Sequence, residues 1–131
     1  SDSVEPIYYR IPLSEFDIGR LPADARTPGT SAFKDAVLLT IAMDYAQKGE
    51  MAVVTVDESE ITVMSFPGTD AALEYILQDL RSGRIAESIP KLESLAKADP
   101  NSVDVLFNLG LAYSETGQFD EAIIRLKNVV R

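Results

Sequence analysis

Residues 109–122 read Leu-Gly-Leu-Ala-Tyr-Ser-Glu-Thr-Gly-Gln-Phe-Asp-Glu-Ala. The glycine at position 117 lies between two segments whose apolar residues recur at helical spacing. Because glycine is the residue that most readily turns the chain at the end of a helix, the stretch predicts a helix–turn–helix. We expect the first helix over residues 103–116 and the second over residues 119–130.

The same arrangement occurs one copy earlier in the chain. A shift of 34 residues places Gly83 on Gly117 and Leu92 on Leu126. It predicts a second pair of helices, over residues 70–81 and 84–97, joined by a turn at Gly83. The sequence Asp99-Pro100-Asn101 separates the copies, since proline cannot continue a helix and disfavours helical angles in the residue before it.

The second copy resembles the tetratricopeptide repeat, a helical pair with a characteristic set of small and aromatic residues. The matching residues are Leu109, Gly110, Tyr113, Gly117, Phe119 and Ala122. The resemblance implies that the two helices approach closely where Gly110 and Ala122 are small. Two repeats are fewer than the about three that such a solenoid usually needs, so we expect either a longer array or residues 1–68 acting as the missing neighbour.

The first copy departs from the family pattern at three positions. Ile76 stands where a small glycine is expected, Asp79 where tyrosine is expected, and Ser88 where alanine is expected. We interpret residues 69–102 as a degenerate terminal repeat and residues 103–131 as a repeat close to the pattern, truncated from a longer array. No family is recognised for residues 1–68.

The N-terminal half has a different pattern, in which period-two alternation flanks one helix. Pro12 limits the first strand to an edge of its sheet or ends it there. Ser31 is expected to cap the helix and Gly49 to follow its end. If the first two strands pair, the helix is their right-handed crossover. The expected elements are a strand over residues 6–13, a helix over 31–48, and a hairpin of strands over 51–56 and 61–66.

Residues 14–30 connect the first strand to the helix and contain two glycines and two prolines, which break regular structure. A connection of this length is either functional or mobile. Arg20 and Arg26 could contact an acidic partner, although a solvated loop is the simpler interpretation. Gly29-Thr30-Ser31 could hold an anion at the start of the helix, but capping is the simpler role.

These elements predict an α+β chain in two parts. Residues 1–68 would form a small α+β domain of order strand–helix–strand–strand, and residues 69–131 two tetratricopeptide-like helical pairs, a fragment of a solenoid. About sixty residues with three strands and one helix make a marginal core, so we expect the first part to lean on the second.

Composition excludes several functional classes. The chain has 131 residues without cysteine or histidine, so it offers no disulfide, no thiolate nucleophile and no histidine base or metal ligand. A net charge of −9 argues against nucleic acid as a partner. No apolar run approaches the about 20 residues that span a bilayer. The sequence favours the cytoplasm, but periplasmic or secreted locations stay open because a signal peptide could have been removed.

We therefore expect no enzyme, no catalytic residue, no cofactor and no metal site. The acidic turn at Asp57, Glu58 and Glu60 lacks the spacing of an EF-hand calcium loop. The expected function is non-catalytic protein–protein interaction or scaffolding, with a protein or peptide as the partner. The sequence leaves the oligomeric state open.

The resemblance implies that the first helix of each repeat lines a groove for a peptide or a partner helix. Asn108 also matches a position that grips a peptide carboxylate in some repeats of this family, but the first copy supplies neither Lys nor Asn there, and we predict no such clamp. Two alternatives stay open: the α/β half buries the groove and binding lies in missing repeats, or the chain is an accessory domain of a larger enzyme. The groove residues are Leu73, Leu77, Leu80, Arg81, Asp104, Phe107, Asn108, Leu111, Ser114 and Glu115.

Overall fold

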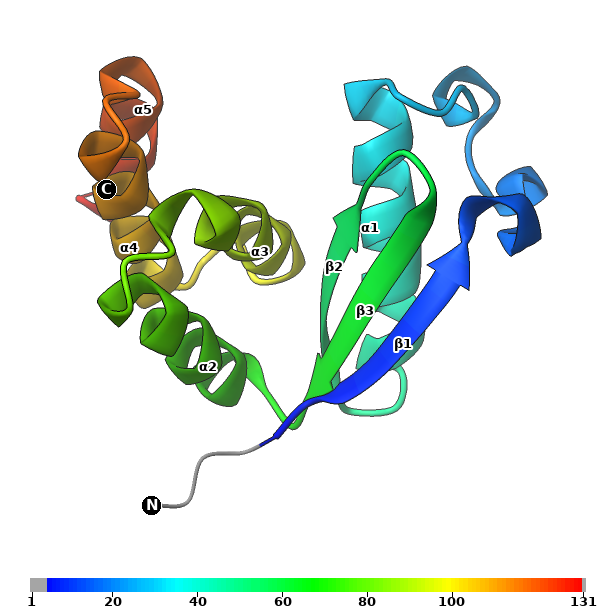
Figure 1. Ribbon diagram of the computed structural model, residues 1–131, viewed down its shortest axis with the longest axis horizontal. Coiled ribbons are helices and arrows are strands. Elements are labelled where there is room, and N and C mark those ends of the chain that lie inside the picture. Colours follow the sequence, from blue (N-terminus) through cyan, green and yellow to red (C-terminus); the bar gives the residue numbers. More distant parts are fainter. Residues whose placement is uncertain (1–4, 131) are drawn as a thin grey trace.

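A three-stranded antiparallel sheet lies between one helix on one side and a set of four helices on the other (Figure 1). The computed structural model describes residues 5–130, and the fold is α+β with helical hairpins. The regular elements are β1 (Ile7–Pro12), α1 (Ser31–Ala46), β2 (Met51–Val56), β3 (Glu60–Phe66), α2 (Thr69–Arg81), α3 (Ile85–Ala98), α4 (Val103–Glu115) and α5 (Phe119–Val129).

The strand order is β1-β3-β2, with both neighbours antiparallel to the central β3. The hairpin of β2 and β3 agrees with the sequence, and its turn is held by the Asp57 carboxylate, which accepts hydrogen bonds from the backbone N–H groups of Ser59 and Glu60 at 2.8 Å each. The conditional pairing of the first two strands is wrong. Because β3 inserts between β1 and β2, α1 connects the two edges of the sheet.

The two faces of the sheet belong to two buried clusters. On one face, Val54, Ile61 and Val63 pack with Phe33 and other apolar residues of α1. The opposite face is buried against the four helices. There the cluster is formed mainly by Val53, Met64, Phe66, Ala72, Leu73, Ile76, Leu92, Leu95, Val105, Leu109, Ala112, Tyr113 and Ala122. One continuous core therefore runs from the sheet into the helical pairs.

The N-cap of helix α1 lies one residue before the expected cap, and the helix begins at Ser31. Thr30, rather than Ser31, is the N-cap, and its hydroxyl accepts a hydrogen bond from the Phe33 N–H at 3.2 Å. Capping is therefore the role of this segment. Gly49 follows the helix with φ of 75°, a left-handed angle that favours glycine.

The segment between β1 and α1 packs against the rest of the chain. It forms three short 3₁₀ turns over Leu13–Glu15, Ile18–Arg20 and Ala23–Ala25. Arg20 makes a bidentate ion pair with Asp44 of α1, and both N–O distances are 2.8 Å. Arg26 donates to the carbonyl oxygens of Leu21 and Gly19. Both arginines thus hold the loop to the rest of the chain, while most residues of the loop, including the two arginines, stay exposed to solvent as expected.

The opposite edge of the sheet, at β2, is covered by α3. The buried Val54 N–H donates a hydrogen bond of 2.7 Å to the Ser94 hydroxyl of α3. Pro90 lies inside the same helix and removes one backbone donor, a feature that the sequence interpretation did not use. Ser88 and Ser94, both fully buried, face different partners, because the Ser88 hydroxyl donates to the Arg84 carbonyl within its own helix.

Candidate functional site

A hollow of about 450 Å³ opens between α2 and α4. Leu77, Leu80 and Leu111 give it an apolar floor, while Arg81 and Glu115 are exposed charges on its lining. Helices α2 and α4 are related by the 34-residue shift, so equivalent positions of the two copies face the same hollow. All eight lining residues belong to α2, α3 or α4: Leu77, Leu80, Arg81, Ile85, Asn108, Leu111, Ala112 and Glu115.

Six of the ten groove residues expected from the sequence line this hollow: Leu77, Leu80, Arg81, Asn108, Leu111 and Glu115. The other four do not. Leu73 is only 7% exposed and lies in the core facing the sheet, so its assignment to the groove is wrong. Asp104, Phe107 and Ser114 are exposed on α4 outside the lining.

Two lining residues were missed by the sequence interpretation. Ile85 is the first residue of α3 and closes one end of the hollow. Ala112 is buried on α4, next to the exposed Leu111. The family resemblance assigns groove positions to the first helix of each pair, so a residue of the second helix such as Ile85 carried no signal.

The exposed charges on α2 and α4 are mainly acidic. Arg81 pairs with Glu74 at 3.3 Å, both side chains being well exposed. The carboxylates of Asp70, Asp104 and Glu115 are exposed on the same two helices. The Asn108 side chain donates to the backbone carbonyl of Asp104 at 2.8 Å, which occupies its amide within the helix.

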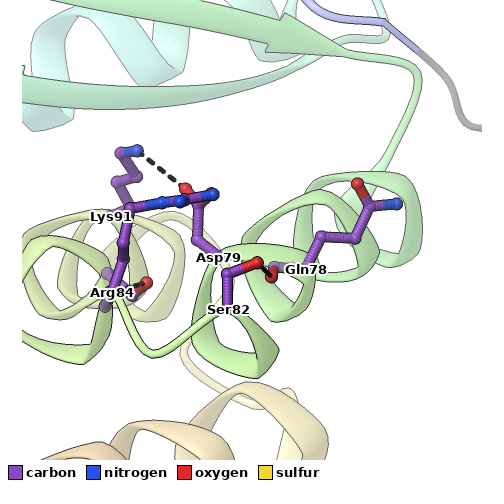
Figure 2. Close-up of polar contacts among 6 residues, drawn as sticks. Gln78, Asp79, Ser82, Arg84 and Lys91 are labelled. Carbon is purple, nitrogen blue, oxygen red and sulfur yellow. Dashed lines mark hydrogen bonds and ion pairs between the residues drawn. The ribbon is translucent and has the colours of Figure 1, made fainter.

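In the first copy, an ion-pair cluster holds α2 against α3 (Figure 2). Asp79 accepts hydrogen bonds from the Arg84 guanidinium at 3.0 and 3.3 Å and from the Lys91 ammonium at 3.2 Å. Burial opposes ionisation of Asp79, but the hydrogen bonds from Arg84 and Lys91 outweigh it and keep its pKa below the usual value. The carboxylate therefore joins the two helices where the family has tyrosine.

The second copy joins its helices at the same positions with different chemistry. Tyr113 and Arg125 are the 34-residue equivalents of Asp79 and Lys91, and the Arg125 guanidinium lies 5.5 Å from the centre of the Tyr113 ring. Glu93 of α3 accepts from the Tyr113 hydroxyl at 2.9 Å and from Arg125 at 2.8 Å. Burial, followed by the hydrogen bond to Glu93, raises the pKa of Tyr113 to about 12. This cluster connects α3, α4 and α5.

Gly110 sets the close approach of α4 to α5. A Cβ atom built on Gly110 would lie 2.7 Å from the Leu126 Cγ atom, which is closer than real contacts allow. The expectation of a small residue at this contact is confirmed for Gly110, and the buried Ala122 packs in the same core. Gly110 thus lets α4 lie close to α5, on the side of α4 that does not line the hollow.

Two larger hollows, of about 570 and 550 Å³, lie around α1. The second runs between α1, β2 and α3 and is lined with charged side chains. Several of these already have partners within the chain: Lys97 pairs with Asp35, Lys91 with Asp79, and Glu93 with Arg125. The charges in this hollow therefore hold α3 to its neighbours.

The part of the chain that the structure describes contains no cluster of three or more acidic, cysteine or histidine side chains suited to a metal ion. Within residues 5–130, no helix is both long and apolar enough to cross a bilayer.

The fold and the hollow define a class of protein in which helical hairpins stack beside a small α/β layer. Residues 79–131 match the tetratricopeptide repeat family, so this segment is a tetratricopeptide repeat segment. The match starts at Asp79, and the assignment of most of α2 to the first repeat rests on the 34-residue shift. No curated protein matches the chain. Tetratricopeptide repeats generally mediate protein–protein interaction and are typically non-enzymatic, which makes a protein the expected class of partner.

Proposed function

We propose that the chain is a non-catalytic interaction module that binds a peptide or a partner helix in the hollow between α2 and α4. The observation that carries the proposal is the open apolar floor of Leu77, Leu80 and Leu111. Leu111 is 43% exposed, and Phe107, which lies beside the hollow on the same helix, is 46% exposed. A run of exposed apolar side chains along one groove is typical of a binding surface.

The packing of the α/β half supports an accessible groove. Strand β2 contacts the helical pairs through Val53, and β3 through Met64 and Phe66, and all three lie in the buried core. Phe66 packs on Tyr75 with ring centres 5.5 Å apart, on the face of α2 away from the hollow. This arrangement favours the groove over the alternative in which the α/β half buries it.

The exposed charges on α2 and α4 indicate which charge the partner should carry. Carboxylates outnumber cations on the exposed faces of α2 and α4, with Arg81 partly neutralised by Glu74. We infer a ligand that presents aliphatic or aromatic anchors together with lysine or arginine. Electrostatic steering by such charges raises association rates and weakens with added salt.

A display library of random peptides tests the proposal directly, because the selection requires no named partner. Selected peptides are titrated against the wild-type chain, Leu111→Asp and Ile123→Asp by fluorescence anisotropy. Ile123 is a matched control because it is 51% exposed on α5 and does not line the hollow. We expect Leu111→Asp to weaken binding by about tenfold or more, the effect of losing one buried apolar anchor, and Ile123→Asp to leave it unchanged.

Equal binding by all three proteins would refute the groove. Circular dichroism checks that Leu111→Asp is folded, and a second substitution, Leu77→Asp on the facing helix, probes the same hollow from the other repeat. Selected peptides lacking basic residues would contradict the inferred charge preference while leaving the groove itself in place.

A further inference from the structure

The two edges of the sheet differ in whether their outward-pointing backbone groups have hydrogen-bond partners. At β2 the outward-pointing N–H of Val54 is bound by Ser94 of α3. In β1 the odd-numbered residues exchange backbone hydrogen bonds with β3. The Leu13 N–H continues this register and donates to the Ser59 carbonyl at 3.0 Å. The backbone groups of Tyr8 and Arg10 therefore point away from β3. Among residues 5–130, no strand lies beyond β1 (Figure 1).

The exposed edge carries large apolar side chains. Ile7, Tyr8 and Tyr9 are 57%, 48% and 48% exposed. Proteins usually protect an open edge with charges, bulges or a covering element, and an apolar edge tends to pair with another strand. Pro6 and Pro12 bracket this stretch, and each lacks the N–H that would extend a ladder. The available window is thus five residues long.

We propose that β1 pairs with β1 of a second copy of this chain, antiparallel about a two-fold axis at Tyr9, to form a continuous six-stranded sheet. In this register Tyr8 lies opposite Arg10 of the second copy, and Arg10 opposite its Tyr8. Cation and aromatic ring then meet twice, on one face of the sheet. On the other face Tyr9 meets Tyr9, and Ile7 meets Ile11.

The sequence Ile-Tyr-Tyr-Arg-Ile is therefore complementary to itself when reversed about its centre. The pairing also gives hydrogen-bond partners to the outward N–H and C=O groups of Tyr8 and Arg10. Any other strand at this edge would have to supply the same hydrogen bonds. A two-fold interface uses the same surface on both copies, and α3 covers the opposite edge, so assembly ends at a dimer. Because the window is short, the buried area falls below the about 1,200 Å² of stable complexes, and we expect a weak dimer.

Sedimentation velocity over about 1 µM to about 1 mM tests the dimer, a range chosen for weak association. The wild-type sedimentation coefficient should rise with concentration from the monomer toward the dimer value. Tyr8→Arg places a second cation opposite Arg10 at both contacts and should weaken association. Tyr8→Glu places a carboxylate there and should retain it, with a dissociation constant at least about tenfold lower than that of Tyr8→Arg.

The two variants are matched, since both replace the same tyrosine by a long charged side chain. A wild-type chain that stays monomeric at every concentration overturns the proposal. Equal association by the two variants overturns the register, and with it the two-fold pairing.

Cross-linking gives an independent measurement that does not depend on charge. The chain contains no cysteine, so Tyr9→Cys introduces a single thiol that faces its own copy across the two-fold axis. Ile7→Cys is the control on the same face, because two such thiols would lie about 13 Å apart along the strands, beyond the reach of a disulfide. Mild oxidation should give a covalent dimer with Tyr9→Cys and little with Ile7→Cys. Equal yields would contradict the proposed register.

Discussion

Ser94→Ala tests the contact that joins the helical segment to the sheet. Ser94 is fully buried, and its hydroxyl receives the Val54 N–H at 2.7 Å. The substitution removes the acceptor and leaves that N–H buried at the edge of β2. An unsatisfied buried donor costs about 1–3 kcal/mol, so we expect the free energy of unfolding to fall by that amount.

Ser88→Ala is the matched control on the same helix. Ser88 is equally buried, but its hydroxyl donates to the Arg84 carbonyl within α3, and the equivalent residue of the second copy is already alanine, Ala122. We expect this change to alter the free energy of unfolding by less than about 0.5 kcal/mol, the usual scale where no buried partner is orphaned. The two substitutions remove the same atom from the same degree of burial.

Urea unfolding monitored by circular dichroism measures both variants. At a common slope, Ser94→Ala should lower the urea midpoint by about 0.5–1.5 M, given a slope near 2 kcal/mol per molar. Hydrogen exchange should become faster at the Val54 amide in Ser94→Ala alone. Similar midpoints for the two variants would refute the argument that this hydrogen bond, rather than simple burial of a serine, fastens α3 to β2.

Three further predictions concern the helical pairs. Gly110→Ile places on α4 the residue found at the same position of the first copy. Because a Cβ there already meets Leu126 at 2.7 Å, we expect the free energy of unfolding to fall by about 1–3 kcal/mol or more. Urea titration measures this change. Tyr113 has its pKa raised to about 12 in the folded protein, so its contribution is complete below pH 10 and is lost as pH rises toward 12, by up to about 2–3 kcal/mol; Tyr113→Phe should flatten that part of a stability–pH curve. The pKa of Asp79 is lowered in the folded state, so its stabilisation is present above its ordinary pKa and disappears as pH falls through the folded value; Asp79→Asn should remove this acid-dependent loss, which thermal unfolding below pH 5 would reveal.

Local signals in the sequence were enough to place most helices and strands. The turn glycines Gly83 and Gly117 have φ of 85° and 78°, the left-handed angles for which glycine is suited. Ser102 caps α4 by accepting from the Val105 N–H at 3.3 Å. Each of these features depends on residues only a few positions apart, and such information is present in a single sequence.

Strand order and loop packing depended on contacts distant in sequence. Pairing of β1 with β3 brings together residues more than forty positions apart, and alternation along β1 does not specify which strand it will meet. Arg20 reaches Asp44 across 24 positions. A charged residue in a glycine- and proline-rich stretch has no local property that distinguishes a fastened loop from a solvated one, so the sequence could not show that this segment packs on α1.

The lining of the hollow was partly predictable, because the family resemblance assigns its residues by their positions in each repeat. Equivalent residues of the two copies, Leu77 with Leu111 and Arg81 with Glu115, do line one hollow. The assignment of Leu73 to the groove was wrong because helical periodicity places this residue near the boundary between two faces of α2. The sequence could not indicate that a sheet would cover one of those faces and take Leu73 into the core.

One departure of the first copy from the family pattern, Ile76, lies in the core that the helices share with the sheet. In the second copy, Gly110 lets α4 approach α5 closely. In the first copy, Ile76 occupies the equivalent position, is fully buried, and belongs to the same cluster as Val53 and Met64 of the sheet. The same cluster contains Leu92 of α3, which is the 34-residue equivalent of Leu126. The bulkier side chain of Ile76 therefore fills a core that α2 and α3 share with the sheet, whereas Gly110 leaves room for the close approach of α4 to α5.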